Sequence, residues 1–282
     1  MDNPWISRRV LNYAHQGGAR EGPSSTMYAM RRAVSGAGAH GLELDVHVTL
    51  DRQLVVCHDA TVDRTTNGSG RIADLTLAEV QSLDNAYWWV PGTVVHHEAP
   101  EADYILRGRA PEDDPDLRIP TLIEVLEAFP GTYLNLDIKL TAPDVEPYEE
   151  LVAKVLLEYG RTDDVIVASF LDHALAAFSA HAPDISTAAG TGDTAAFFLA
   201  VRGGSDPPPT PHHALQVPAE LYGQTVVDEA FVAAAHDHGL AVHVWTIDEE
   251  DDMRRLLALG VDGIMTDRPS AMAAVLAGAQ WQ

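Results

Sequence analysis

The stretch Gly41-Leu42-Glu43-Leu44-Asp45-Val46 places two carboxylates on alternate residues of a short apolar run. Side chains of a β-strand alternate between its two faces, so Glu43 and Asp45 share one face and the apolar residues share the other. Two like charges held this close repel each other unless a cation lies between them. The pattern therefore predicts a Ca²⁺ or Mg²⁺ site with oxygen ligands. The alternative is a half-buried edge strand whose acidic face is solvated.

The composition limits the class of protein and its partners. A chain of 282 residues is long enough for one large α/β barrel or for two ordinary domains. Its 18 basic and 42 acidic residues give a formal net charge of -24, which argues against nucleic acid or an anionic membrane as a partner. Cys57 is the only cysteine, so no intrachain disulfide is possible. No run reaches transmembrane length and no leader pattern is present, so we expect no stable membrane insertion and a cytoplasmic location.

Strand patterns alternate with helical patterns along most of the chain. Eight strand patterns start near residues 11, 42, 133, 165, 185, 214, 241 and 263, and the segments between most of them have helical spacing. This alternation is typical of a (β/α)8 TIM barrel, an α/β fold in which right-handed crossovers join parallel strands. A doubly wound open sheet is the alternative, but the Gly-rich dinucleotide loop that often marks it is absent. The sequence does not indicate an oligomeric state.

One long segment interrupts the alternation. A short turn at Asp51 predicts a hairpin strand near residue 54, and the aperiodic segment 84–118 contains Trp88 and Trp89. We expect residues 1–282 to form a single barrel with an insertion at about 51–118, and its 84–118 part to lie ordered over one end of the fold. Trp88 or Trp89 is expected to wall the substrate pocket; the alternative is that both only pin the insertion to the barrel.

Polar residues gather at the predicted carboxyl ends of the strands, where barrel enzymes hold their chemistry. Asp137 faces inward at the end of its strand, so it joins Glu43 and Asp45 as a third carboxylate that suits a hard cation. His15 ends the first strand, and His58 follows the hairpin strand. We expect both imidazoles at the same mouth, where they can take and give a proton at a phosphate ester near pH 7.

Several motifs of the chain resemble those of the glycerophosphodiester phosphodiesterases. The matching stretches are His15-Gln16-Gly17, Pro23 to Thr26, Glu43 to Val46, His58 to Gly70, Ile119 to Leu122, Asn135 to Lys139, Trp245-Thr246 and Asp262 to Asp267. The resemblance covers nearly the whole predicted barrel and is most specific over residues 41–70. It implies a metal-dependent barrel of the phospholipase C-like type that hydrolyses small-molecule glycerophosphodiesters to glycerol 3-phosphate and an alcohol.

The resemblance also implies roles for individual residues. The carboxylates of Glu43, Asp45 and Asp137 would bind the metal, although the family more often has Glu at the last position. His15 and His58 would form the acid–base pair, and we assign the base to His15 and the acid to His58. Residues assigned to the substrate are Lys139, which would hold the phosphate, and Trp245.

Two positions depart from the usual motif. The family commonly has Arg where this chain has Gln16, and Glu where it has Ser24. A neutral amide cannot grip phosphate as the guanidinium fork does, so the contact that Gln16 makes with substrate is expected to be weaker. Arg20 lies in the same predicted loop, and we expect it to restore part of the missing positive charge. An arginine of the insertion is the alternative.

Two other functions are open at this point. A sphingomyelinase D-like lyase would release a cyclic phosphate, because a neighbouring hydroxyl is well placed to attack phosphorus. A catalytically weak binding barrel would keep the fold and the metal but lose its grip on phosphate through Gln16 and Ser24. The presence of both histidines and all three carboxylates argues against the weak barrel.

Overall fold

The fold is a nearly closed parallel barrel, seen in a computed structural model that describes residues 3–6, 9–110 and 112–278. Among these residues the barrel strands are β1 (Leu11–His15), β2 (Gly41–Val48), β4 (Tyr133–Ile138), β5 (Val165–Ala168), β6 (Ser186–Thr187), β7 (Ala214–Pro218), β10 (Ala241–Trp245) and β11 (Gly263–Thr266). Their order in the sheet is β6-β5-β4-β2-β1-β11-β10-β7, and a parallel bridge between Ala188 and Ala214 joins its two ends. The predicted TIM barrel and its eight strands are confirmed.

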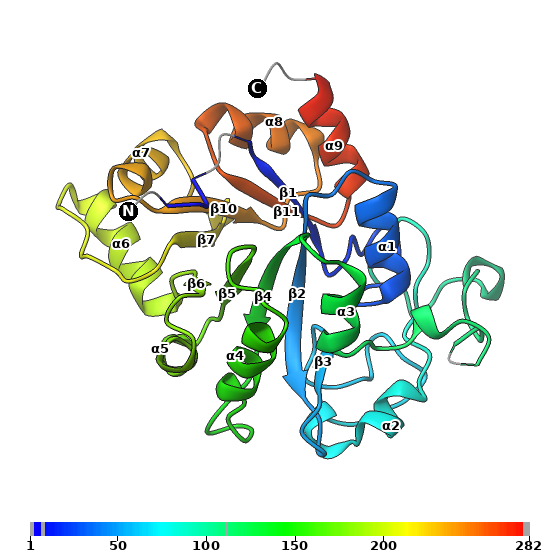
Figure 1. The fold of residues 1–282 in the computed structure, drawn as a ribbon. Coiled ribbons are helices and arrows are strands. Elements are labelled where there is room, and N and C mark those ends of the chain that lie inside the picture. Colours follow the sequence, from blue (N-terminus) through cyan, green and yellow to red (C-terminus); the bar gives the residue numbers. More distant parts are fainter. Residues whose placement is uncertain (1–2, 7–8, 111, 279–282) are drawn as a thin grey trace.

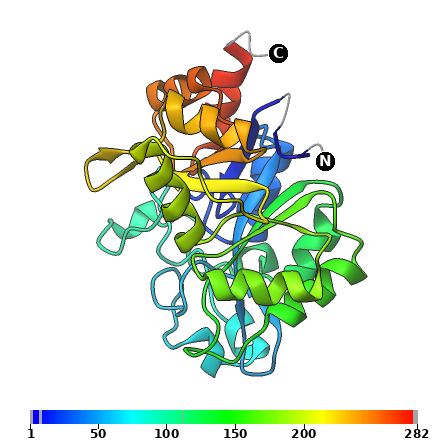
Figure 2. The ribbon, with the colours of Figure 1, turned by 90° about the vertical axis from the view of Figure 1, so that its left-hand side faces the viewer.

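Helices surround the strands on the outside of the barrel (Figures 1 and 2). They are α1 (Met27–Ser35), α3 (Leu122–Ala128), α4 (Glu149–Glu158), α5 (Asp172–His181), α6 (Thr191–Gly203), α7 (Glu229–Asp237), α8 (Glu250–Leu259) and α9 (Pro269–Gly278). Local caps fix where some of them begin: the hydroxyl of Thr26 accepts a hydrogen bond from the Ala29 amide, and Thr121 with Glu124 forms a capping box before α3. No helix of the described residues is long and apolar enough to cross a membrane.

The alternating pattern of β2 separates the core from the interior of the barrel. Leu42, Leu44 and Val46 join the apolar cluster that packs under α1, α3 and α4. The side chains of Glu43 and Asp45 point the other way, and these residues are only 5% and 1% exposed. Since β2 pairs with β1 and β4 on its two sides, it is not an edge strand, and the reading of a solvated acidic face is wrong.

The predicted hairpin after β2 is present. The short strand β3 (Leu54–Val56) pairs antiparallel with β2, and it is followed by η1 (Ile72–Asp74) and α2 (Leu77–Gln81). The next segment contains the short turns η2 (Glu101–Asp103) and η3 (Pro115–Leu117), and it lies beside α1 in Figure 1.

Both indoles of this segment are anchored by hydrogen bonds to neighbouring loops. Trp89 Nε1 donates to the carbonyl of Ala19 at 3.0 Å, and Trp88 Nε1 donates to the carbonyl of Thr66 at 2.9 Å. Trp89 also packs in a small apolar cluster with Leu106. The two tryptophans therefore hold the segment on the loops that follow β1 and β3.

A second small hairpin lies beside α6. Its strands are β8 (Glu220–Leu221) and β9 (Gln224–Thr225), which pair with each other and not with the barrel. In Figure 2 this gold hairpin projects from the side of the barrel. The hairpin follows β7 directly, at the carboxyl end of the strand, so it stands at the end of the barrel where the predicted polar residues gather.

Candidate active site

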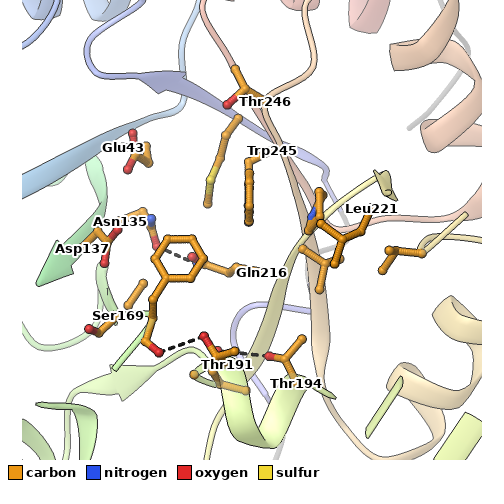
Figure 3. A pocket seen from close by; sticks show the side chains of 18 of the residues that line it. Glu43, Asn135, Asp137, Ser169, Thr191, Thr194, Gln216, Leu221, Trp245 and Thr246 are labelled. Carbon is orange, nitrogen blue, oxygen red and sulfur yellow. Dashed lines mark hydrogen bonds between the residues drawn. The ribbon is translucent and has the colours of Figure 1, made fainter. Parts of the chain in front are cut away.

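A cavity of about 600 Å³ opens at the carboxyl ends of the barrel strands. We call one side of it the polar wall, which consists of His15, Glu43, Asp45, His58, Asn135, Asp137 and Lys139. The other side, the apolar wall, consists chiefly of Phe170, Phe198, Val217, Leu221, Val226 and Trp245. Figure 3 shows Glu43, Asn135 and Asp137 on one side of the cavity and Leu221 on the other, with Trp245 between them.

Strand register places the polar wall. His15 of β1 is paired with Glu43 of β2, and Asp45 of β2 is paired with Asp137 of β4. Because directly paired residues of adjacent strands project from the same face, these side chains converge inside the barrel. The register thus brings the three predicted metal ligands close to His15, the first of the two predicted catalytic histidines.

The ammonium group of Lys139 lies between two of the three predicted metal ligands. Its Nζ is 3.1 Å from Asp45 Oδ1 and 3.2 Å from Asp137 Oδ2. The third carboxylate, that of Glu43, accepts a hydrogen bond at Oε2 from the backbone N–H of Gln16 at 3.1 Å. As the side chains stand, no three His, Cys, Asp or Glu groups of the described chain are gathered in a metal-binding cluster.

The donor atoms nevertheless suit a hard cation. Asp45 Oδ2 and Asp137 Oδ1 are buried, and neither has a hydrogen-bond partner among the described residues. An unpartnered buried carboxylate oxygen is costly, and oxygen ligands are those that Ca²⁺ and Mg²⁺ prefer. Burial and the neighbouring Asp45 carboxylate raise the pKa of Glu43, and burial raises that of Asp137. A cation among the three would therefore keep them ionised.

His15 is held by a carboxylate on the side of the ring away from Glu43. Its Nδ1 lies 2.7 Å from Asp267 Oδ1, and its Nε2 lies 3.8 Å from Glu43 Oε2. Burial disfavours the charged imidazolium, but the Glu43 and Asp267 carboxylates outweigh burial and raise the pKa of His15 to about 9. The Asp267 contact fixes the ring and leaves Nε2 as its reactive nitrogen.

His58 is held in the same way on the other side of the polar wall. Its Nδ1 lies 2.6 Å from Asp59 Oδ1, while Arg64 donates to both oxygens of Asp59 at 2.6 and 3.1 Å. Burial opposes ionisation of Asp59, but the hydrogen bonds from His58 and Arg64 outweigh it and lower the pKa of that carboxyl. The structure thus contains two histidines, each oriented through Nδ1 by an ionisable carboxylate.

The remaining predicted substrate residues lie in different places. Trp245 lines the cavity with its ring edge against Phe170 at a centroid distance of 5.8 Å. Gln16 is 4% exposed and places its Nε2 3.4 Å from His15 Nε2. Arg20 lies 3.5 Å from the Asp248 carboxylate and is not among the residues that line the cavity. Of the described residues between 84 and 118, none lines it either, so the prediction that Trp88 or Trp89 walls the pocket is wrong.

Comparison with known families decides the identity of this barrel. The model of the Glycerophosphoryl diester phosphodiesterase family matches residues 15–271, which include both histidines and all three carboxylates. The chain belongs to that family. The family resemblance inferred from the motifs is therefore confirmed.

Individual members of the glycerophosphoryl diester phosphodiesterase family match over most of their length. A glycerophosphodiester phosphodiesterase of Caldanaerobacter subterraneus is 32% identical over 94% of this chain and 96% of its own. One from Bacillus subtilis is 30% identical over 93% of this chain and 84% of its own.

Solved structures of the family share the barrel. The glycerophosphoryl diester phosphodiesterase domain of a Mycobacterium tuberculosis protein superposes with a TM-score of 0.75 at 23% identity, covering 95% of this chain and 98% of that one. A phosphodiesterase of Oleispira antarctica, solved in complex with the product sn-glycerol-3-phosphate, gives a TM-score of 0.66 at 22% identity over 94% and 96% of the two chains. At these identities the likeness concerns the fold.

The sequence-based reading assigned no role to the carboxylates that orient the histidines. Asp59 directly follows His58, and Asp267 directly follows the strand that pairs with the one ending in His15. Both lie within stretches that resemble this family. The position of Asp59 next to His58, and that of Asp267 at the end of a barrel strand, could have indicated these roles, because polar residues at the strand ends of a barrel converge on one mouth.

Proposed function

We propose that the protein hydrolyses glycerophosphodiesters to glycerol 3-phosphate and an alcohol, with His15 and His58 moving the protons. The observation that carries the proposal is the pair of histidines, each oriented through Nδ1 by a carboxylate, at one cavity that also holds Lys139 and three acidic side chains. A phosphodiester needs one group that removes a proton from the nucleophile and one that protonates the departing alcohol.

Lys139 supplies positive charge for the phosphate. Of the described residues that line the cavity it is the only Lys or Arg. Burial opposes its charged form, but the Asp45 and Asp137 carboxylates outweigh burial and raise the pKa of Lys139, so the ammonium stays protonated. In a chain of net charge -24, such a local cation is needed to attract an anionic substrate.

We further propose that Glu43, Asp45 and Asp137 hold a divalent metal, Ca²⁺ or Mg²⁺, as expected in a family that generally depends on one. The two buried, unpartnered oxygens of Asp45 and Asp137 support this proposal. When bound, the ion would neutralise the non-bridging phosphate oxygens and stabilise the charge that develops on them.

The proposed proton transfers balance over one turnover. His15 acts in its neutral form, which a cation held by Glu43 would favour by offsetting the carboxylate charge that raises the pKa of His15. It takes a proton from the nucleophile, an O–P bond forms, the ester P–O bond breaks, and His58 gives its proton to the departing alcohol; proton exchange with solvent then resets any histidine left in the other state. The nucleophile is water or the neighbouring hydroxyl of the glycerol moiety. If the hydroxyl attacks, proximity favours a cyclic phosphate, which water then opens with the two histidines exchanging roles.

The test is a substrate panel of glycerophosphocholine, glycerophosphoethanolamine and glycerophosphoglycerol, assayed for glycerol 3-phosphate in the presence of Ca²⁺ or Mg²⁺. Release from at least one of them is expected, together with loss in the His58→Ala variant. The exposed His96, which lies outside the cavity lining, provides the matched control, and His96→Ala is expected to keep full activity. A cyclic phosphate as the final product would favour the lyase alternative, and failure to turn over any diester would favour the weak binding barrel.

We also propose that residues 1–282 act as a single barrel unit with its insertion at about 51–118, located in the cytoplasm. The strand order, in which both halves of the chain contribute to one sheet, supports the single unit. A single cooperative thermal transition, followed by both circular dichroism and tryptophan fluorescence, is expected. Two separate transitions would divide the chain, and recovery of the protein in a membrane or secreted fraction would contradict the location.

A further inference from the structure

The carboxylate that orients His15 lies just beyond the last strand of the barrel. Asp267 follows β11, which stands between β10 and β1 in the sheet (Figure 1). The parallel pairing of β11 with β1 ends at Thr266, which is paired with Ala14. Strand register therefore fixes Thr266 but does not extend to Asp267. The contact of Asp267 with His15 Nδ1 has to be set by groups outside the strand ladder.

The Asp248 carboxylate holds the backbone of Asp267. Its Oδ1 accepts a hydrogen bond from the Asp267 backbone N–H at 2.8 Å and another from the Thr266 hydroxyl at 3.0 Å. The Asp267 carbonyl accepts a hydrogen bond from the backbone N–H of Arg20 at 3.2 Å. A charge-assisted hydrogen bond to a carboxylate is stronger than one between two neutral backbone groups. Asp248 therefore provides the stronger of the two restraints on the Asp267 backbone.

Asp248 is anchored by contacts that do not involve Asp267. It lies in the loop after β10, and the backbone N–H of the preceding Ile247 donates to the carbonyl of Met265 at 2.9 Å. The side chain of Ile247 belongs to the apolar cluster on this side of the barrel. The guanidinium of Arg268 donates to the Asp248 carbonyl at 3.1 Å. The loop is thus fixed to β11 and can hold Asp267 in a defined place.

The Asp248 side chain does not reach the reacting groups. It is 16% exposed, and Asp248 is not among the described residues that line the cavity. Its effect on the reaction would have to pass through Asp267, whose Oδ1 lies 2.7 Å from His15 Nδ1. Both links between Asp248 and the imidazole are direct contacts at hydrogen-bonding distance.

We propose that Asp248 is a positioning residue for His15. It fixes the Asp267 backbone so that the Asp267 carboxylate holds the His15 ring at Nδ1 and leaves Nε2 for the reaction. This inference rests on the proposed function, in which His15 moves a proton. Misplacing a catalytic group by about 1 Å can cost about 10²-fold in rate, so a small shift of the Asp267 backbone would slow the reaction. The alternative is that Asp248 only joins two loops.

Two substitutions at position 248 separate the position of the acceptor from its charge. Asp248→Asn loses the charge but keeps an oxygen at the same distance from the backbone, so kcat for glycerophosphocholine should stay within about three-fold of wild type. Asp248→Glu keeps the charge but displaces the acceptor by one methylene, so kcat should fall about ten-fold with little change in KM. A Glu variant as fast as the Asn variant, or faster, would overturn the positioning role.

A double-mutant cycle tests whether Asp248 acts through Asp267. Asp248→Ala alone should lower kcat at least about ten-fold, but in an Asp267→Ala background it should add less than about two-fold, because the contact that it supports is already lost. Losses that multiply in the double variant would overturn the proposal. If Asp248→Ala does not fold, Asp248→Glu takes its place in the cycle.

Asp228 provides the matched control. Its Oδ1 also accepts a backbone N–H, that of Phe231 at 2.9 Å, and its Oδ2 pairs with Arg202 at 2.6 Å. It caps α7 and is not among the described residues that line the cavity. Asp228→Ala should lower the thermal midpoint and leave kcat unchanged. A fall in kcat as large as that in Asp248→Ala would mean that both act only through stability.

Proton NMR of the imidazole N–H groups gives a readout without turnover. The proton shared by His15 Nδ1 and Asp267 should exchange slowly with water, and its resonance is assigned by its loss in His15→Ala. In Asp248→Ala this resonance should broaden or disappear, while that of the His58–Asp59 pair, whose atoms lie 2.6 Å apart, should persist. Asp248→Glu again replaces an Ala variant that does not fold.

The spectrum separates this inference from the function on which it rests. Both resonances unchanged in the variant, in an enzyme that hydrolyses diesters, would overturn the positioning role and leave the phosphodiesterase function standing. Selective loss of the His15 resonance, in a wild-type protein that turns over no diester, would overturn the function and keep the positioning of the ring.

Discussion

The two walls of the cavity are held in place by different means. The polar wall stands on β1, β2 and β4, which are neighbours in the sheet and hold their side chains in continuous register. The apolar wall combines Val217 of β7 and Trp245 of β10 with side chains from α6 and the small hairpin, next to the place where a bridge between Ala188 and Ala214 closes the barrel. Backbone register fixes positions closely, whereas loops and surface elements vary more freely. We infer that the chemistry lies on the polar wall, and that the choice of substrate depends on the part of the apolar wall that α6 and the small hairpin supply.

Removing either histidine of the polar wall should have the largest effect on the rate of hydrolysis. If His58 is the acid, His58→Ala should slow glycerophosphocholine hydrolysis by about 10²- to 10⁴-fold. The same variant should largely spare the p-nitrophenyl ester of glycerol 3-phosphate, because that leaving group departs without protonation. His15→Ala should be slow on both substrates, since the nucleophile still needs its base.

The opposite pattern would exchange the roles of the two histidines and keep the rest of the mechanism. Equal large losses for both variants on both substrates would show that each histidine also binds the phosphate. Either result is read from initial rates with saturating metal and substrate.

The pH dependence of the free energy of unfolding tests the barrel interior, where His243 is fully buried. Burial lowers the pKa of His243 to about 4 in the folded protein, against about 6.5 in the unfolded chain. As pH falls from 6.5 to 4 the unfolded chain takes up the proton first, so His243 should cost about 3 kcal/mol of stability across that window. His243→Leu should remove this acid-dependent part of the loss. If urea unfolding of the two proteins shows the same pH slope, His243 is not buried in neutral form.

The carboxylates behind the histidines should matter less than the histidines themselves. Asp267→Asn and Asp59→Asn keep the shape but weaken the hold on Nδ1, so kcat should fall on the order of 10- to 100-fold. Asp206 pairs with His238 at 3.2 Å on the surface, which makes Asp206→Asn a matched control with unchanged kcat. A wild-type rate in both site variants would mean that the rings are oriented by packing alone.

Much of the polar wall could be predicted from the sequence, because strand alternation determines it. Glu43 and Asp45 share a face for the same reason that Leu42 and Leu44 share the other, and the barrel fold brings Asp137 beside them. The carboxylate that orients His15 could not be identified from the sequence, because Asp267 reaches His15 only when the last barrel strand pairs with the first.

Apart from Trp245, which the family resemblance assigned to the substrate, no sequence pattern indicated the apolar wall. The strands β8 and β9 have only two residues each, and Leu221 and Tyr222 stand in a turn-forming segment with no periodicity. The aromatic residues that did attract a prediction, Trp88 and Trp89, serve to anchor the insertion. The sequence shows that aromatic residues stand in a loop, but only the tertiary fold shows whether they face the cavity or pack elsewhere.

Arg20 should show the smallest effect. The sequence predicted that it replaces the missing arginine at position 16, but its guanidinium lies 3.5 Å from Asp248 and is partly solvated. Arg20→Ala should therefore change KM for glycerophosphocholine by less than about three-fold. A large rise in KM that Gln16→Arg partly reverses would restore the prediction made from the sequence.

Chelation is the most direct test of metal-assisted hydrolysis at the polar wall. Exhaustive chelation should abolish the release of glycerol 3-phosphate from glycerophosphocholine, and titration with Ca²⁺ or Mg²⁺ should restore it. In Asp45→Asn and Asp137→Asn the restored activity should require a higher metal concentration, because each variant weakens one oxygen ligand. Full activity after exhaustive chelation, or in Glu43→Gln without added metal, would show that the polar wall works without a metal.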